Sequence, residues 1–436
     1  MPSDRWLYAW GLGSVALGGA SLLVPLYVVA LGGRPFDLGL LASSSAFVGV
    51  PGALASGRLV ERPSARRPIV IGTLVLVAAM LLVLPLISSL PVVIVANAIV
   101  WLAFAAIAPV LTLLVTVDVP ESEWSGRFAR LNAFQGWGWA GGLVAGFVWT
   151  LVGGRILGPA TAQRTFFVVV GVCAAVAALL TGRWLPAEGG RRALASPRRV
   201  ARALGRTRRL NVRGATVPFT PGRLYWTTRR FAPRRVADRF TARLALYFVA
   251  VALCFTGFAA FFAPLPAFLT GVGYGSDAIF ALYLVSSLGS ALFFVPVGRL
   301  TERYPVDVLQ TAGLTVRAIA LPTVAIVGSA LAASLTGLLA TAVVFLVVGL
   351  TWAVIAVTAS TLVTRLAPQQ IRGEALGIYT ALTAFAGGVG ALVGGWLAGV
   401  GYLVAFGVAA ALVIVGAVLV AVTRRVPSHA PRHASS

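Results

Sequence analysis

The sequence has no lysine and few acids: its 35 basic side chains are all arginine, against 12 acidic ones in 436 residues. Charged residues make up only 11% of the chain and hydrophobic residues 59%, with a mean hydropathy of +0.93. Soluble domains carry about 25% charged residues, so this composition excludes a water-soluble globular protein. A net charge of +23 can indicate nucleic-acid binding, but a chain this apolar lacks the polar face required, and we expect no nucleic-acid partner.

Groups that carry out catalysis or bind metals are scarce as well. The two cysteines, Cys173 and Cys254, lie inside apolar runs, and the two histidines, His429 and His433, lie near the end of the chain. They provide neither a disulfide framework nor a metal site. No Ser/His/Asp or phosphate-binding arrangement occurs near a predicted span end. We therefore expect no enzyme, no metal and no cofactor.

Long apolar runs dominate the rest of the chain. A bilayer core about 30 Å thick requires ~20 apolar residues in a helix, because lipid offers no partners for exposed backbone amides. Twelve stretches meet this requirement, six before and six after a polar segment. They cover residues 6–31, 38–57, 69–90, 92–117, 133–157, 165–185, 244–269, 278–297, 306–329, 335–362, 376–398 and 402–422.

The arginines are distributed unevenly between the two sides that these spans define. With the N-terminus in the cytoplasm, 31 arginines lie on the cytoplasmic side, three in outer loops and one, Arg317, inside a span. Cytoplasmic loops carry the excess of positive charge in membrane proteins. We therefore predict a multi-pass protein of the cell membrane with both termini in the cytoplasm.

One long polar segment, residues 186–243, holds sixteen arginines and separates the two sets of spans. We divide the chain into a six-helix bundle (1–185), this arginine-rich cytoplasmic linker (186–243), a second six-helix bundle (244–425) and a cytoplasmic tail (426–436). An arginine near anionic headgroups contributes about 1 kcal/mol to membrane attraction, so membrane lipids are the expected partners. A docking site for another partner or a nucleic acid, and simple disorder, are the alternatives for this linker.

The two sets of spans carry a repeated motif. GRLVER closes the second span at Gly57–Arg62, and GRLTER closes the eighth at Gly298–Arg303, 241 residues later. Such internal repetition predicts two six-helix halves in the same orientation. Three further matches are Pro25 and Gly32 with Pro264 and Gly271 at an offset of 239, Asp37 with Asp277 at 240, and Gly126 with Gly373 at 247.

On these residues the chain resembles the major facilitator superfamily. The segment from Gly57 to Arg67 reads Gly-x-Leu-x-Glu-Arg-x-x-x-Arg-Arg, similar to the signature of that family's loop between helices two and three, with Ser64 where the family usually has glycine. The resemblance implies an all-α membrane protein with twelve transmembrane helices in two pseudo-symmetric six-helix bundles. It also implies a secondary transporter that works by alternating access.

The signature and its copy indicate gating charges at the cytoplasmic helix ends. We expect Glu61 to contact Arg372 at the start of the eleventh helix. By the repeat, Glu302 should contact Arg127 or Arg130. Asp118 would pair with Arg62 or Arg66, and Arg365 with Glu302; ordinary surface ion pairs are the alternative. The gating set is Gly57, Glu61, Arg62, Arg66, Arg67, Asp118, Arg127, Gly298, Glu302, Arg303, Arg365 and Arg372.

Glycines at four-residue spacing mark the fifth and eleventh spans, and this spacing is typical of close helix packing. They are Gly138, Gly142 and Gly146 on the fifth span and Gly390 and Gly394 on the eleventh. The Gly-Pro step of the family's antiporter signature and its frequent arginine on the fourth helix are both absent here. These absences disfavour proton-coupled drug export.

Buried ionisable groups usually mark substrate or ion pathways in membrane proteins. Arg317 lies eleven residues into the ninth span, about 16 Å deep at 1.5 Å per residue. It is either an anchor for a carboxylate or phosphate or a structural arginine, and the peripheral place of the ninth helix in the resembled family favours the structural role. The other cavity candidates are neutral: Tyr27, Asn97, Trp101, Asn132, Gln135, Tyr283, Trp352 and Tyr379, with Trp137, Thr256 and Thr358 as further polar positions.

The sequence therefore favours a secondary transporter of a small solute, working as a monomer. Because titratable groups are missing from most of the predicted lining, a neutral or hydrophobic solute is favoured. One alternative is organic-anion transport through Arg317. The other is a non-transporting scaffold or sensor that recruits a partner through the arginine-rich linker.

Overall fold

The computed structural model describes residues 5–59, 63–115, 123–185, 241–331, 334–368 and 371–425. These ranges contain twelve helices of 21 residues or more, and no strand. The first half comprises α1 (Trp6–Ala30), α2 (Pro35–Leu59), α3 (Pro63–Val83) with the 3-10 turn η1 (Leu84–Leu86), α4 (Leu90–Leu114), α5 (Trp124–Leu157) and α6 (Pro159–Trp184). The second comprises α10 (Ala242–Phe262), the short α11 (Leu265–Gly271), α12 (Ser276–Arg303), α13 (Val306–Leu331), α14 (Leu335–Leu366), α15 (Arg372–Val400) and α16 (Tyr402–Val422).

Each predicted apolar stretch falls on one of these long helices, with 244–269 continuing past the end of α10 into the short α11. The all-α membrane fold is confirmed. In the described ranges, eleven helices are long and apolar enough to cross a membrane by length and composition. The twelfth long helix, α2, has 25 residues. Helix α5 starts at Trp124, nine residues earlier than the apolar stretch beginning at 133, because its arginine-bearing first turns stay helical around buried Trp124 and Phe128.

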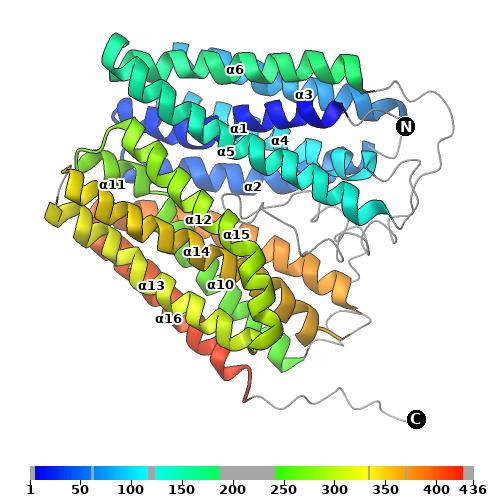
Figure 1. Ribbon diagram of the computed structural model, residues 1–436, viewed down its shortest axis with the longest axis vertical. Coiled ribbons are helices and arrows are strands. Elements are labelled where there is room, and N and C mark those ends of the chain that lie inside the picture. Colours follow the sequence, from blue (N-terminus) through cyan, green and yellow to red (C-terminus); the bar gives the residue numbers. More distant parts are fainter. Residues whose placement is uncertain are drawn as a thin grey trace.

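Helices pair in the same way in both halves (Figure 1). In the first half α1 packs against α5 and α6, α2 against α4, and α3 against α6. In the second half α10 packs against α15 and α16, α12 against α14, and α13 against α16. Since α10 takes the place of α1, α12 of α2 and so on to α16, the two halves are structural repeats.

The turn after the first helical segment of each half has the same geometry. Gly32 and Gly273 both adopt positive φ, at 82° and 97°, a conformation that costs glycine little and other residues more. Each turn closes with the hydrogen bonds of a Schellman motif. In the first half, the N–H of Gly33 donates to the Val28 carbonyl and the N–H of Gly32 to the Val29 carbonyl, both at 2.9 Å. In the second half, the N–H of Tyr274 donates to the Leu269 carbonyl and the N–H of Gly273 to the Thr270 carbonyl, both at 3.0 Å.

This turn corrects one detail of the predicted repeat. The structural counterpart of Gly32 is Gly273, not Gly271, which gives the same offset of 241 residues as the GRL motifs. At that offset Pro25 corresponds to Pro266, not to Pro264. Pro-Leu pairs occur at Pro25-Leu26 and Pro264-Leu265, but α10 ends at Phe262 and the chain restarts as α11, whereas α1 continues past Pro25.

Glycine allows the backbones of the central helices to touch. A Cβ at Gly142 of α5 would fall against the Val15 carbonyl and the backbone of Gly18 and Gly19 on α1. A Cβ at Gly390 of α15 would fall against the Thr256 carbonyl on α10. The offset of 241 relates Val15 to Thr256, so the two contacts are equivalent. The predicted packing role of these glycines is what the structure shows.

The two halves meet at one end of the bundle. We call the end where α1 begins and α16 finishes the terminal end, and the opposite end the far end. At the far end Gly39 of α2 lies against Gly395 and Ala391 of α15, and the rings of Phe166 and Phe280 are 5.8 Å apart. Toward the terminal end the helices of the second half slope away from those of the first (Figure 1).

A single hydrogen bond between described side chains crosses from half to half. Gln163 Nε2 at the start of α6 donates to Ser276 Oγ at the start of α12, at 2.7 Å. Both residues lie at the far end. The specific contacts between the halves are thus concentrated away from the termini.

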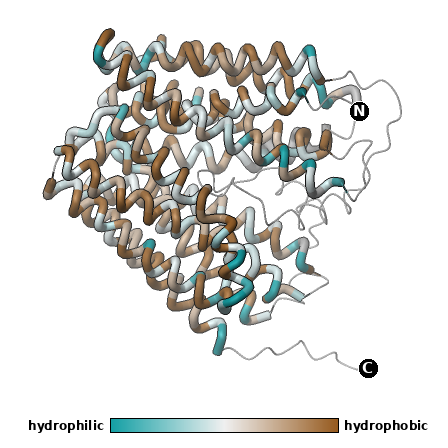
Figure 2. The backbone as a smooth tube through the Cα atoms, in the orientation of Figure 1, coloured by the Kyte–Doolittle hydropathy of each residue, from teal (hydrophilic) through white to brown (hydrophobic). Residues whose placement is uncertain are grey.

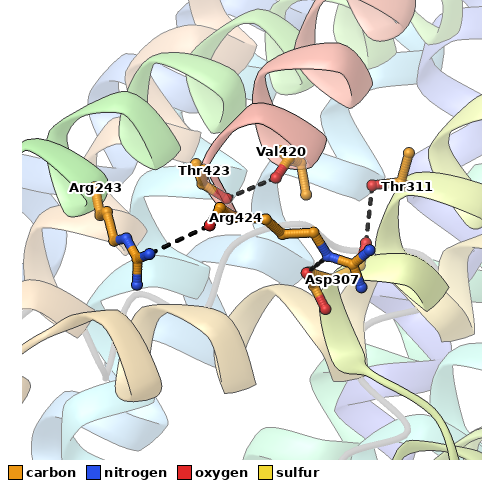
Figure 3. Close-up of polar contacts among 6 residues, drawn as sticks. All are labelled: Arg243, Asp307, Thr311, Val420, Thr423 and Arg424. Carbon is orange, nitrogen blue, oxygen red and sulfur yellow. Dashed lines mark hydrogen bonds and ion pairs between the residues drawn. The ribbon is translucent and has the colours of Figure 1, made fainter. Parts of the chain in front are cut away.

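Hydrophilic residues gather mainly at the terminal end, whereas apolar residues run along the helices (Figure 2). In the second half, Arg424 forms an ion pair with Asp307 at the start of α13, and Arg243 of α10 donates to the Arg424 carbonyl at 3.2 Å. Figure 3 shows how these groups connect α10, α13 and α16. Arg243, the last residue of the predicted linker, therefore already belongs to α10; residues 186–240 lie outside the described ranges.

Candidate functional site

A cavity of about 320 Å³ lies between the two halves. Its walls come from both bundles and from nearly every helix that faces the interface. Helices of the first half supply Ser21, Leu22, Pro25, Leu38, Leu41, Ala42, Ser45, Ala46, Asn97, Trp101, Trp139 and Leu143. The second half supplies Phe255, Phe258, Ala259, Phe262, Ala263, Pro266, Tyr283, Ser286, Arg317, Phe345, Val348, Trp352, Gly387 and Ala391.

Equivalent positions of the repeat line this cavity from both halves. Pro25 and Pro266 both line it, as do Ser45 and Ser286, and both pairs are separated by 241 residues. The cavity therefore lies where a pseudo-twofold relation between the halves would place a shared central site. Its volume is at the small end of the ~300–1,000 Å³ typical of ligand pockets, which suits a small molecule.

The walls are mainly aromatic and apolar. Trp101 lies 6.3 Å from Trp139 between ring centroids in the first half, and Phe255 lies 6.1 Å from Trp352 in the second. Asn97 Nδ2 donates to Ser45 Oγ at 2.7 Å, which ties α4 to α2. Aromatic side chains bury large areas of a ligand at specific ring geometries, so the cavity favours a ligand with an apolar or aromatic body.

Among the described residues of the wall, Arg317 is the one charged side chain, and it is 1% exposed. Its Nη1 donates to the Val348 carbonyl at 2.9 Å and lies 3.4 Å from Thr351 Oγ1. Its guanidinium carbon lies 4.5 Å from the ring centre of Phe258 and 5.4 Å from that of Trp352, within cation–π range. Although α13 packs against α14 and α16, its arginine reaches the cavity past α14.

Five of the nine cavity candidates from the sequence line this cavity: Asn97, Trp101, Tyr283, Arg317 and Trp352. The structure places the other four elsewhere. The Tyr27 hydroxyl donates to the Ile87 carbonyl at 2.9 Å and its ring packs on Phe167. Tyr379 packs on the edge of Phe255. Asn132 and Gln135 are buried on α5, on the terminal side of Trp139.

The three further polar positions also lie outside the cavity wall. Trp137 is 78% exposed on the outer surface of α5. The hydroxyls of Thr256 and Thr358 donate to the carbonyls of Ala386 and Val354, respectively. A threonine hydroxyl in a membrane helix can donate its hydrogen bond to a nearby backbone carbonyl. A threonine at the depth of the cavity therefore need not face the cavity.

The aromatic lining of α10 was missed, although the sequence contains its signal. Phe255, Phe258 and Phe262 recur at intervals of three and four residues, the spacing of one helix face. In an all-apolar helix this spacing does not say whether the face meets a cavity or a neighbouring helix. Trp139 and Phe345 likewise carry no signal that separates them from core residues.

The members of the gating set that the structure describes lie at the terminal end, in two groups. Glu61, Arg62 and Asp118 lie outside the described residues, and Gly57 lies in the last turn of α2. Arg66 is buried, and Arg67 donates to the Gly182 carbonyl of α6. Arg67 therefore binds within the first half.

Most side chains of the second group are exposed at the surface. Arg127 is half-buried, and Glu302, Arg303, Arg365 and Arg372 are exposed. Arg372 Nε lies 3.4 Å from the Ala367 carbonyl, and a Cβ at Gly298 would meet nothing within 4 Å. Among the described residues, no ion pair joins Glu302 to Arg127, Arg130 or Arg365. Since the halves diverge here, the contacts between halves stay a prediction for a state in which this end is closed.

Comparison with known proteins agrees with this architecture. The family model described as Major Facilitator Superfamily matches residues 9–388 and 316–436. No curated protein matches the sequence.

Solved transporter structures share the fold. The nucleoside transporter NupG superposes with a TM-score of 0.69 at 14% identity, over 97% of this chain and 99% of that one. A bacterial homologue of the human lysosomal transporter Spinster, in an inward-facing and occupied conformation, gives 0.68 at 13% identity, over 97% and 96%. A POT family transporter gives 0.67 at 11% identity, over 97% and 95%. The two-times-six helix architecture, the repeated motif and the family match lead to one conclusion: the chain belongs to the major facilitator superfamily.

Proposed function

We propose that the protein is a secondary transporter that carries a small solute by alternating access, with the two halves rocking about the central cavity. The observation that carries this proposal is the cavity itself, which is built from equivalent positions of the two halves. Transporters with internal repeats bind their solute near mid-membrane at the interface of the repeats. Contact at the far end and divergence at the terminal end fit one of the two access states.

The terminal end faces the cytoplasm in this proposal. The arginine excess at that end supports the orientation. In this proposal the conformation is therefore an inward-open state of a monomer in the cell membrane. The arginine-rich linker then lies next to anionic headgroups and acts as a membrane tether. The gating charges Glu61, Glu302 and Arg372 would meet their partners when this end closes.

Filling the cavity tests the proposal. Ala42 lines the cavity from α2, and tryptophan there would occupy space the solute needs. We expect A42W to abolish both solute binding and uptake into proteoliposomes, while the protein still folds. Because a ligand that binds only the native state raises its apparent stability, a thermal-shift screen of the purified protein identifies a solute for this assay.

The matched control is Leu40→Trp, two residues away on the same helix. Leu40 is 40% exposed on the outer surface, so its replacement leaves the cavity unchanged. Binding and uptake should then equal those of the natural protein. Uptake by A42W at the rate of L40W would refute a central solute site.

A further inference from the structure

Arg317 presents one edge of its guanidinium without a protein partner. Its Nη1 is engaged by Val348 and Thr351, but Nε is buried and has no hydrogen-bond partner. No described residue accepts a hydrogen bond from Nη2 either. Nε and Nη2 lie on the same edge of the planar group, and together they form a fork that matches the two oxygens of a carboxylate.

The surroundings of this edge hold the charge in place but leave it uncompensated. Among the described residues, the cavity wall contains no aspartate, glutamate or histidine, and the described acidic residues lie in or next to the first or last turns of the helices. The rings of Phe258, Phe262 and Trp352 lie 4.5–5.5 Å from the guanidinium carbon. These rings support a cation over their faces but offer no anion.

A buried cation without a counter-ion is costly in a membrane protein. Helix packing alone does not require a charge at position 317. At the corresponding place of the first half, 241 residues earlier, the chain has the apolar residue Leu76. The missing charge must therefore come from something that enters the cavity. Arg317 is part of the cavity wall, so its unpartnered donors lie at the depth of the cavity.

We propose that Arg317 binds the carboxylate of a small organic acid, whose aromatic or apolar body lies among Trp101, Trp139, Phe255 and Phe345 in the cavity. This inference rests on the proposed transport function and names its solute class. Val348 and Thr351 hold the guanidinium from one side and leave the Nε/Nη2 edge for the ligand. The solute is thus an organic anion, in contrast to the neutral solute that the sequence favoured.

The test compares two probes of equal shape, benzoate and its neutral isostere benzamide, with chloride as a third arm. The dissociation constants are measured on the purified full-length protein through the fluorescence of the cavity tryptophans and through thermal shift. We expect benzoate to bind about 10- to 100-fold more tightly than benzamide, the range for a hydrogen-bonded charge. Chloride should compete with benzoate weakly, since it lacks both the second acceptor and the body.

Two variants assign the preference to Arg317. R317Q should bind both probes equally, and R317K should retain only part of the preference, because a lysine keeps the charge but not the fork. R155Q, at an exposed arginine of the far end, should behave like the natural protein. The ligand-free R317Q protein should melt at the same temperature or higher, because a buried unpaired charge is removed.

Equal affinity for benzoate and benzamide in the natural protein would overturn the inference, as would an unchanged preference in R317Q or R317K. Saturation by chloride that benzoate cannot displace would also overturn it, in favour of an inorganic anion. A large fall in the melting temperature of ligand-free R317Q and R317K would assign the arginine to structure alone. If the protein transports a neutral solute and the A42W substitution blocks that transport, only the proposed solute class is wrong. If the A42W substitution does not weaken the binding of any solute, the transport proposal itself fails.

Discussion

Replacing Gly395 with valine should reduce transport by about tenfold or more. A Cβ at this position would lie 2.7 Å from the Pro35 carbonyl oxygen and 3.0 Å from the Gly39 Cα, both across the interface. A side chain would therefore wedge α2 and α15 apart at the far end. Overpacking of this kind typically costs about 1–3 kcal/mol, which changes a two-state equilibrium by about 5- to 150-fold.

The wedge acts only on the state in which the far end is closed, so it biases the protein against the inward-open state. The matched control is Gly399→Val, one turn further along α15, where a Cβ would meet nothing within 4 Å. Uptake of a bound solute into proteoliposomes compares the two variants, and their melting temperatures show whether both fold. Equal uptake by G395V and G399V would contradict closure of the far end during transport.

Valine at Gly142, or at its counterpart Gly390, should destabilise the protein strongly. At both positions the added Cβ would overlap backbone atoms of the first helix of that half, around Val15 and Thr256. Backbone atoms cannot rotate away as the end of a side chain can, so the two helices must separate. We expect a loss at or above the ~1–3 kcal/mol usual for overpacking, seen as a lower melting temperature and a poor yield in detergent.

Gly154→Val is the control for this pair of variants, since it lies on α5 but a Cβ there would meet nothing within 4 Å. The repeat predicts that G142V and G390V fail to a similar degree, because their contacts correspond. A variant in one half that melts like G154V, while its counterpart unfolds, would show that the two halves do not share this packing.

The fold could be predicted from the sequence because it follows from one strong constraint. A chain with 59% hydrophobic residues must satisfy its backbone inside each membrane segment, and the repeated GRL motif then relates the two halves. The predicted helix bounds and the predicted alignment of the repeat were wrong where the ends of an apolar stretch differ from the ends of the helix. The polar first turns of α5 continue the helix around Trp124, and the break near Pro264 misaligned Pro25 by two residues.

The candidate site was predictable only in part. Arg317 was recognised because a charge at membrane depth is rare, but the sequence did not reveal that its side chain passes α14 to reach the cavity. Tyr27 was expected in the cavity, yet its hydroxyl finds the Ile87 carbonyl on the other side of α1. In helices that are apolar all round, periodicity cannot distinguish a cavity-facing side chain from a packed one, and only the arrangement of the helices decides.

The most direct test of the account is a pair of distances between spin labels, measured with and without bound solute. One pair joins Arg130 of α5 to Arg299 of α12 at the terminal end, and the other joins Ile156 of α5 to Gly271 of α11 at the far end; each pair links one half to the other. Both native cysteines are first replaced by alanine. Rocking about the central cavity predicts that solute shifts the two distances in opposite directions, one shortening as the other lengthens. Two distances that stay fixed, or that change together, would contradict alternating access by these two halves.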